Sequence, residues 1–330
     1  MGWLARIIDA GHDYRNSLTE VEDGLFLTQG DRRAKVSQFW VLLVLASAIA
    51  AGGVIGNSTP AVIGAMIVAP LATPIYGVAL ATVTGSRSNL RASLLLLVEG
   101  IVVNILIGVA IGLVTFNRMP LTVNPQITGR TAPTLLDLAV AVFTGVAGSF
   151  ALVRRDVSNI LAGVAIAISL VPVLAVVGIT IGSGAWSMAF GALILFLTNA
   201  AAIIVSGILV FTAAGYQRDA AARGAHIGRR AKWIIAVLVV ILVAGLAVAS
   251  ARTYAYQLYV DDTQTAAEAW AQGSAWTVEN VSLVGSSVVA SAVGPGDPPP
   301  IEQLKKAVRA KVPANVPVTI ILGNGRNVNL

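Results

Sequence analysis

The chain has 330 residues, of which 56% are hydrophobic and only 12% charged, and its formal net charge is +6. A soluble domain of this length needs far less apolar surface, so most of the chain is expected to lie in lipid. The absence of cysteine excludes disulfides, thiolate metal sites and a cysteine nucleophile. The basic residues are scattered through short loops without a basic stripe, which argues against nucleic-acid binding.

The N-terminal segment, residues 1–35, is polar and mixed in charge. It has no apolar core or small-residue cleavage site of the kind that marks a signal peptide. Trp3, Leu4, Ile7 and Ile8 recur at helical spacing, which favours a short amphipathic helix at the membrane surface. A frayed tail is the alternative.

Seven segments are long and apolar enough to cross a hydrocarbon core as helices, which takes roughly 20 residues each. The second carries Pro70 and Pro74, and the fifth carries Pro172. Proline lacks the backbone N–H and clashes with the carbonyl one turn back, so both helices are expected to open there. Paired breaks in two halves of a membrane protein point to a midplane binding site. The predicted spans are 36–55, 60–84, 90–116, 134–153, 157–181, 186–215 and 232–251.

The loop charges predict the orientation of these spans. Fourteen basic residues fall in the N-terminal segment and the loops on its side of the membrane, including a basic linker at 216–231. Between spans on the other side, only Arg118 and Arg130 are basic. Because Lys and Arg are retained in the cytoplasm, we expect a cytoplasmic N-terminus and an extracytoplasmic tail.

The tail, residues 252–330, is polar and punctuated by proline and glycine. An alternating, β-branched stretch at 276–293 predicts two strands joined through Gly285 and Ser286. A helical pattern at 301–312 and an apolar run at 316–322 follow. The sequence therefore predicts a small α+β domain. The aromatic residues before it, Trp270 among them, are typical of headgroup level.

Sliding the chain against itself by 99 residues superposes the helix boundaries, several glycines and the proline regions without a gap. This predicts two three-span repeats, 36–116 and 134–215, with the seventh span outside them. Because three is odd, the second repeat would be inverted relative to the first, as in many secondary transporters. A chance alignment of two hydrophobic bundles is the alternative.

Three ordered motifs carry a family resemblance: GNSTPAVIGAMIVAPLATPIYGVALA from Gly56, GVAIAISLVPVLAVVGI from Gly163, and GALILFLTNAAAIIVSG from Gly191. Over roughly 36–215 the chain resembles the hydrophobic membrane family called domain of unknown function 389. The resemblance implies a bacterial integral membrane protein, in the cell (inner) membrane, without an established substrate. That family has paired prolines where Val173 follows Pro172 here, so the second break is the less certain of the two.

Glu99 is the acid that lies well inside a predicted span, near the bilayer midplane. An ionisable group at that depth costs several kcal/mol unless it is paired or wet, which makes Glu99 a candidate proton or cation site. The alternative is a protonated Glu that hydrogen-bonds to a neighbouring helix.

Polar side chains near Glu99 and the prolines are candidates for binding a solute or ion. Oxygens and amides here have two uses: they contact a ligand between the broken helices, or they hold helices together across membrane interfaces. The candidates are Asn104, Thr198, Asn199, Thr73 and Ser169.

Other polar and small residues have structural interpretations. Asp137, three residues after Thr134, has the spacing of a capping box. Asn57 and Asp156 precede spans as N-caps would, and Asp156 also lies beside two arginines, which allows a loop ion pair. Gly108 and Gly112 form a GxxxG motif for close helix packing within or between subunits.

The leading hypothesis is a transporter or channel-like protein for a small solute or ion, with its site between the broken helices. A membrane-anchored sensor or scaffold acting through the external domain is the alternative. We expect no enzymatic activity, because few acid–base groups lie in the membrane. Neither His12 nor His226 has an acid partner at metal-ligand spacing, so no metal or cofactor is expected, and the partners are the bilayer and other copies in a homo-oligomer.

Overall fold

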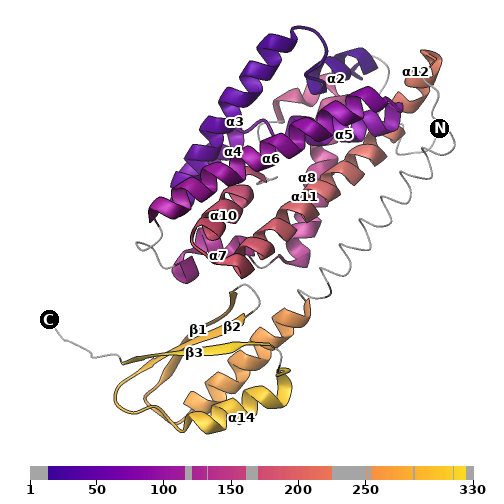
Figure 1. Ribbon diagram of the computed structural model, residues 1–330. Coiled ribbons are helices and arrows are strands. Elements are labelled where there is room, and N and C mark those ends of the chain that lie inside the picture. Colours follow the sequence, from indigo (N-terminus) through magenta and orange to yellow (C-terminus); the bar gives the residue numbers. More distant parts are fainter. Residues whose placement is uncertain are drawn as a thin grey trace.

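The computed structural model describes residues 14–115, 121–131, 133–160, 170–224, 251, 254–284, 287–314 and 316–324. A bundle of apolar helices occupies residues up to 222, and a small unit of strands and helices follows from residue 254 (Figure 1). This confirms the predicted fold class in its coarse form, a mostly helical membrane protein with a small α/β unit at its C-terminal end.

Four helices in the described residues are long and apolar enough to cross a membrane: α3 (Arg32–Ile55), α6 (Arg87–Thr115), α8 (Leu135–Val153) and α11 (Trp186–Ala213). The helices α4 (Thr59–Val68) and α5 (Ala72–Thr84) make a fifth span if counted together, bent by 43°. α10 (Leu170–Gly182) is a shorter apolar helix. Seven predicted spans therefore become four or five here, since residues 161–169 of the fifth span and residues 232–250 of the seventh lie outside the described residues.

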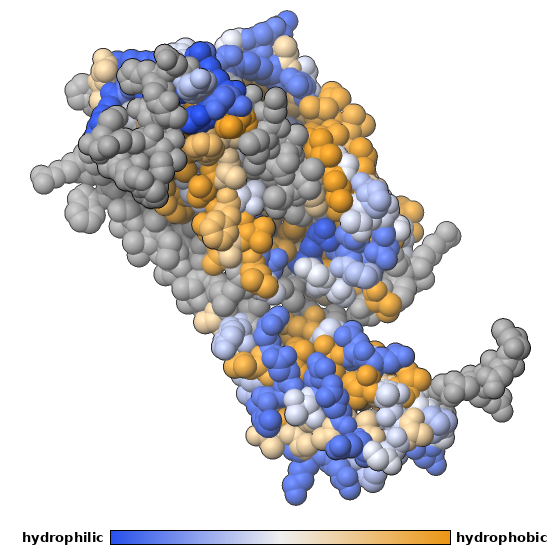
Figure 2. Space-filling view, turned by 180° about the vertical axis from the view of Figure 1, so that it is seen from behind, coloured by the Kyte–Doolittle hydropathy of each residue, from blue (hydrophilic) through white to orange (hydrophobic). Residues whose placement is uncertain are grey.

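The shorter helices α5 and α10 pack against the long helices. α10 lies against α6, α11 and α3, while α5 lies against α6 and α11. α6 and α11 run in opposite directions along the bundle (Figure 1). Apolar side chains also cover the flank of the bundle between its two polar ends (Figure 2). Such a flank is what a lipid-facing surface requires, so the protein is a multi-pass membrane protein.

One end of the bundle is closed by charged elements that the sequence did not predict: α2 (Leu18–Leu25), the 3-10 helix η2 (Arg155–Ile160) and α12 (Tyr216–Ala222). α2 begins with a capping box between Ser17 and Glu20 and buries its apolar face. α12 occupies the start of the predicted basic linker, and the Tyr216 hydroxyl donates to the Asn16 carbonyl at 2.9 Å. Ion pairs join these elements: Arg15–Asp219, Glu20–Arg155 and Glu22–Arg223.

The opposite end is held by amide hydrogen bonds. Here lie the 3-10 helix η1 (Leu121–Val123) and α7 (Pro125–Thr131). Asn124 Nδ2 donates to the Val54 carbonyl at the end of α3, at 2.8 Å. Gln126 Nε2 donates to Thr59 Oγ1 at the start of α4, at 2.9 Å. The two ends of the bundle therefore use different chemistry.

The helix caps confirm one prediction and correct two. Asp137 and Thr134 form the predicted capping box, with the Thr134 N–H donating to the Asp137 carboxylate at 2.7 Å. Asn57 is not a cap: it turns the chain at φ 48°, which places Ser58 in the capping position of α4. Asp156 is in η2 and pairs with Arg154 at 2.5 Å, as the alternative interpretation held.

From residue 276 the C-terminal unit has the predicted order of elements, and a helix that was not predicted precedes them. Residues 254–271 are helical, followed by β1 (Thr277–Val284), β2 (Ser287–Gly294), α14 (Ile301–Lys311) and β3 (Val318–Asn324). The sheet order is β1-β2-β3, with β1 antiparallel and β3 parallel to β2. The hairpin positions Gly285 and Ser286 lie outside the described residues.

Two tryptophans build the core of this unit. Trp270 and Trp276 lie with ring centroids 6.4 Å apart, and both pack with Leu304 and Val308 of α14. The interpretation of Trp270 as a headgroup-level residue is therefore wrong, because its indole is buried under the sheet and donates to the Pro300 carbonyl. A buried indole of this kind contributes a large apolar area to the core, which matters in a small domain because few other side chains can be buried there.

Candidate functional site

The first break separates α4 from α5 at Ala69, Pro70 and Leu71. Ala69 is extended at ψ 126°, as expected of a residue that precedes proline. Pro74 lies in the first turn of α5, where a missing N–H leaves no helical bond unmade. Pro70 alone therefore breaks the span, and Pro74 is compatible with the helix that resumes.

The predicted second break precedes the described part of α10, since residues 161–169 lie outside the described residues, and Pro172 lies in the first described turn of this helix. Asn104 of α6 is fully buried against this turn, and its Nδ2 donates to the Val171 carbonyl at 3.4 Å. Its other amide atom, Oδ1, is buried and has no hydrogen-bond partner among the described residues. Asn104 thus offers an unused carbonyl oxygen beside the described start of α10.

Asn199 of α11 has a similar environment. It is 8% exposed, and its Oδ1 is also buried without a partner. α11 packs against α10, as α6 does, so both unpaired oxygens come from helices that contact α10. At about 1.5 Å per residue, Asn104 lies roughly 25 Å along α6 and Asn199 roughly 20 Å along α11, near the middle of each helix.

The remaining polar candidates are less available. Thr198 donates its hydroxyl to the Ile194 carbonyl of its own helix at 2.7 Å. Thr73 is half-buried in the first turn of α5. Ser169 lies outside the described residues. The structure therefore leaves Asn104 and Asn199 as the polar side chains with unused acceptors, and gives Thr198 a structural bond instead.

Glycines let α10 approach α6 until their backbones touch. A Cβ added at Gly108 would lie 2.8 Å from the Ala175 carbonyl oxygen, and one at Gly112 would lie 2.5 Å from that of Ile179. On α10, added Cβ atoms at Gly178 and Gly182 would collide with the backbone of α6. Two GxxxG motifs thus face one another, and only the one on α6 was predicted.

A related contact joins α5 to α11. A Cβ added at Gly207 of α11 would lie 2.8 Å from the Ala79 Cβ of α5. Gly207 follows Gly108 by 99 residues, and Gly178 follows Ala79 by the same number. The contact of α11 with α5 therefore uses the positions that correspond to the contact of α6 with α10.

The C-terminal ends of α5 and α10 also match. Gly85 and Gly184 both have left-handed backbones, with φ of 71° and 75°. The Ser86 N–H donates to the Ala81 carbonyl, and the Ala185 N–H donates to the Thr180 carbonyl. These bonds are also 99 residues apart and resemble the Schellman closure of a helix.

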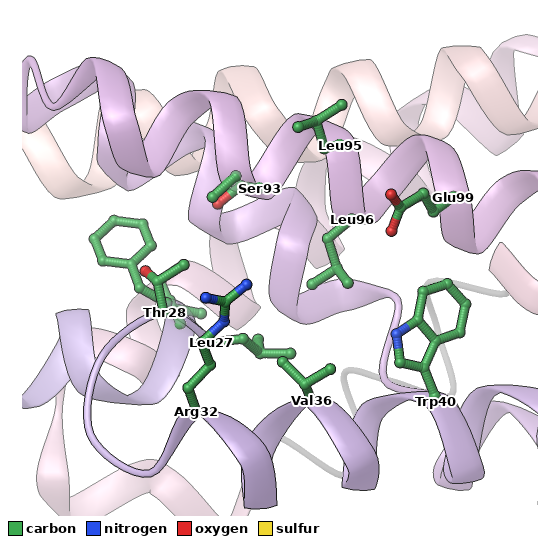
Figure 3. Close-up of a pocket in the computed structure, with 12 residues that line it drawn as sticks. Leu27, Thr28, Arg32, Val36, Trp40, Ser93, Leu95, Leu96 and Glu99 are labelled. Carbon is green, nitrogen blue, oxygen red and sulfur yellow. The ribbon is translucent and has the colours of Figure 1, made fainter.

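Glu99 does not join the buried amides. Its side chain is exposed on the flank of α6, in a groove of about 260 Å³ between α3 and α6. Arg32 and Trp40 of α3 line the same groove, with the Arg32 guanidinium and the Glu99 carboxylate directed into it from its two ends (Figure 3). The structure therefore divides the predicted site into an inner pair of amides and an outer groove.

Sequence reasoning missed three contributors to these sites. Arg32 and Trp40 were assigned only to a loop and a span, because no local pattern indicates that α3 meets α6 at Glu99. The motif of Gly178 and Gly182 is readable in the sequence as GITIG. The helix α2 is indicated by the pattern of Ser17 followed three residues later by Glu20, the signature of a capping box.

The helices that form the inner site are those recognised by comparison with known proteins. Residues 66–205 match the family model of a domain of unknown function, DUF389. This part of the chain is similar to DUF389 domains. The match spans α5, α6, α8, α10 and most of α11, and so includes Asn104, Asn199 and the facing glycines.

One similar protein is an uncharacterized protein of Methanocaldococcus jannaschii. It is 36% identical over 177 residues, which are 53% of this chain and 53% of the relative. The chain thus spans about half the length of the curated relative it matches. No solved structure matches the chain significantly.

Proposed function

We propose that this protein is a transporter or channel-like protein, which moves a small solute or ion past α10. Its binding site would lie between α6, α10 and α11, near the middle of the membrane. The proposal includes a cytoplasmic N-terminus, an extracytoplasmic α/β unit and a homo-oligomeric assembly, and no enzymatic step.

One observation carries this proposal: Asn104 Oδ1 is buried, has no partner among the described residues, and lies on a side chain bonded to the first described turn of α10. Leaving a buried acceptor without a donor costs roughly 1–3 kcal/mol. Such a cost is explained if a passing solute donates a hydrogen bond to this oxygen, or if a cation is coordinated by it. Asn199 Oδ1 supports the same interpretation from α11.

The corresponding contacts of the two halves are further support. In an inverted repeat, the middle helix of each half is related to that of the other by a pseudo-two-fold axis in the membrane plane. The contact pairs Gly108–Gly178 and Gly207–Ala79, and the helix ends at Gly85 and Gly184, are what such a relation produces. Many transporters alternate access by rocking one such half against the other.

The experiment is a flux assay with purified protein in liposomes, using potassium, sodium, chloride and protons as probes. A thermal-shift screen of inorganic ions and small metabolites would extend the range of solutes. We expect Asn104→Leu to abolish the flux of whichever probe the wild-type protein carries. Stability should fall by no more than about 1 kcal/mol, because hydrogen bonds between membrane helices contribute modestly.

The matched control is Thr198→Val, beside Asn199. The Thr198 hydroxyl bonds within its own helix, so its loss should leave flux unchanged. Flux that survives in both Asn104→Leu and Asn199→Leu would contradict the proposed site. A wild-type protein that carries no probe and is stabilised by no compound would contradict the function itself.

A sensor or scaffold is the second candidate, and the C-terminal unit favours it. This unit has its own hydrophobic core, built around Trp270 and Trp276, apart from the core of the bundle. Among the described strands, β1 and β3 each pair on one side only, which leaves two sheet edges for a partner. Deleting residues 253–330 discriminates the two: a transporter should keep its flux, whereas a scaffold should lose its binding partner.

A further inference from the structure

The groove between α3 and α6 runs from the charged end of the bundle toward its middle. The loop Leu25–Thr28 and Arg32 border it at one end, and Trp40 and Glu99 at the other (Figure 3). Its volume of about 260 Å³ has room for several water molecules, each of which takes about 30 Å³ in the liquid. The groove therefore offers a polar entrance and a polar end, with Val36 and Leu96 between them.

Glu99 is the group at this inner end that can exchange a proton. It lies eight residues beyond Arg91 on α6, roughly 12 Å further along the helix at about 1.5 Å per residue. No hydrogen bond or ion pair to Glu99 occurs among the described residues. An ionisable side chain at such depth costs several kcal/mol unless water or a partner reaches it. Water in the groove would meet that requirement.

Arg32 is the charged group that faces the groove together with Glu99 among its described lining residues. The loop Leu25–Thr28 and the α6 segment from Ala92 to Leu96 contribute no further titratable side chain to this lining. α5 and α10 contact α6 as well, and neither contributes a residue to the groove.

The next residue connects this groove to the first helix break. A Cβ added at Gly100 would lie 3.0 Å from Leu71 Cδ2 and 3.4 Å from Leu43 Cδ2. Leu71 is the residue immediately before α5. Glu99 thus faces the groove, and the next residue, Gly100, faces the break. A change of charge at Glu99 therefore occurs one residue away from the contact between α6 and the bent span of α4 and α5.

We propose that this groove is a water-filled crevice through which Glu99 exchanges a proton with the solution on the α2 side of the membrane. In each exchange a hydronium ion transfers its proton to a Glu99 carboxylate oxygen and leaves as water, and the reverse step restores the carboxylate. As a coupling site for flux the crevice rests on the proposed function, but its hydration and its proton exchange do not.

The first test is labelling of single cysteines, for which the cysteine-free chain is already a suitable background. Leu96→Cys and Val36→Cys place the thiol in the groove. Val102→Cys is the control, because Val102 is 48% exposed on the same helix outside the groove. A membrane-impermeant methanethiosulfonate should label the groove cysteines from one side at least about tenfold faster, since the reactive thiolate forms in water and not in lipid.

The second test is modification of Glu99 by dicyclohexylcarbodiimide, an apolar reagent that reacts with protonated carboxyl groups. Mass spectrometry of the peptide containing Glu99 should show modification that declines as the pH rises, and Glu99→Gln should show none. Modification that does not change with pH would overturn the proposal. So would groove cysteines that are labelled no faster than Val102→Cys, because this result would indicate a lipid-filled groove.

These outcomes are separable from those of the flux assay. A hydrated groove with a pH-dependent Glu99 supports the crevice even if no probe is transported. Flux that depends on Asn104 in a protein whose groove is dry would support the transport site and overturn the crevice.

Discussion

The regions around α5 and α10 use corresponding positions for their helix contacts but differ in polarity. α10 meets α6 at Gly178 and Gly108, and α5 meets α11 at the corresponding Ala79 and Gly207. The polar residue Asn104, however, has a fully buried isoleucine, Ile203, at the corresponding position of α11. The two regions therefore match in the positions of their helix contacts, whereas the buried amide without a partner among the described residues lies beside α10.

The largest expected effect comes from the contact at Gly178. Gly178→Ala would drive a methyl group into the backbone of α6, which cannot move as a side chain does. Overpacking of this kind costs typically about 1–3 kcal/mol. We expect the largest fall in melting temperature in detergent for this variant, and a smaller fall for Gly207→Ala, whose closest contact would be the Ala79 methyl group and not a backbone atom.

Two further variants sharpen this prediction. Gly64→Ala is the control, because an added Cβ there meets nothing within 4 Å. Combining Gly207→Ala with Ala79→Gly should restore stability, since it moves the methyl group from one helix to the other. If Gly207→Ala proved as damaging as Gly178→Ala, the two contacts would not differ as the structure indicates.

Two links precede the proline-bearing spans: the first link, residues 56–58, joins α3 to α4, and the second link, residues 154–156, follows α8. The first link provides the next prediction. Asn124 secures the first link by donating to the Val54 carbonyl, and its Oδ1 accepts from the Gln126 N–H, both at 2.8 Å. Hydrogen bonds of this kind contribute roughly 1 kcal/mol each, so Asn124→Ala should lower the free energy of unfolding by about 1–2 kcal/mol. Thermal unfolding in detergent measures this, with the exposed Val123→Ala as the neighbouring control.

Most of the bundle could be predicted from the sequence because long apolar runs and prolines act locally. The observed bounds of α3, α6, α8 and α11 lie within a few residues of the predicted spans. The capping box of Thr134 and Asp137 and the order of elements after residue 276 were predicted for the same reason.

The site could be predicted only in part, because it depends on which face of each helix is buried. Glu99 and Asn104 are five residues apart on one helix, which turns them to different faces. A helix that is apolar all round gives no pattern to decide which face points inward. Trp270 was misinterpreted for a similar reason, since aromatic residues suit both a membrane interface and a small core.

The two helix ends at Gly85 and Gly184 test whether the halves match. An alanine with a left-handed backbone costs about 1–2 kcal/mol, partly offset by its smaller unfolded-state entropy. Gly85→Ala and Gly184→Ala should therefore each lower stability by about 1 kcal/mol. Similar shifts in melting temperature are expected for both. A large loss in one with none in the other would weaken the correspondence between the halves.

The smallest effect is expected at the second link, which an ion pair attaches to α2. Arg155 donates to Glu20 and holds the pKa of that carboxyl at about 2, below its ordinary value of 4.5. A depressed pKa means that the stabilisation is present above about pH 4.5 and is lost as the pH falls toward 2. Gly56, the corresponding residue of the first link, carries no charge, so no such pH dependence should arise there.

The variant Glu20→Gln isolates this contribution. Between about pH 6 and about pH 3, its melting temperature should fall less than that of the wild-type protein, because the neutral side chain has no proton to gain. The difference should be small, since both partners are exposed and an exposed pair contributes little. Arg155→Gln should reproduce it, and the double variant should add nothing further. If the single variants were additive instead, the pH dependence would come from other carboxylates, and the second link would be no more charge-dependent than the first.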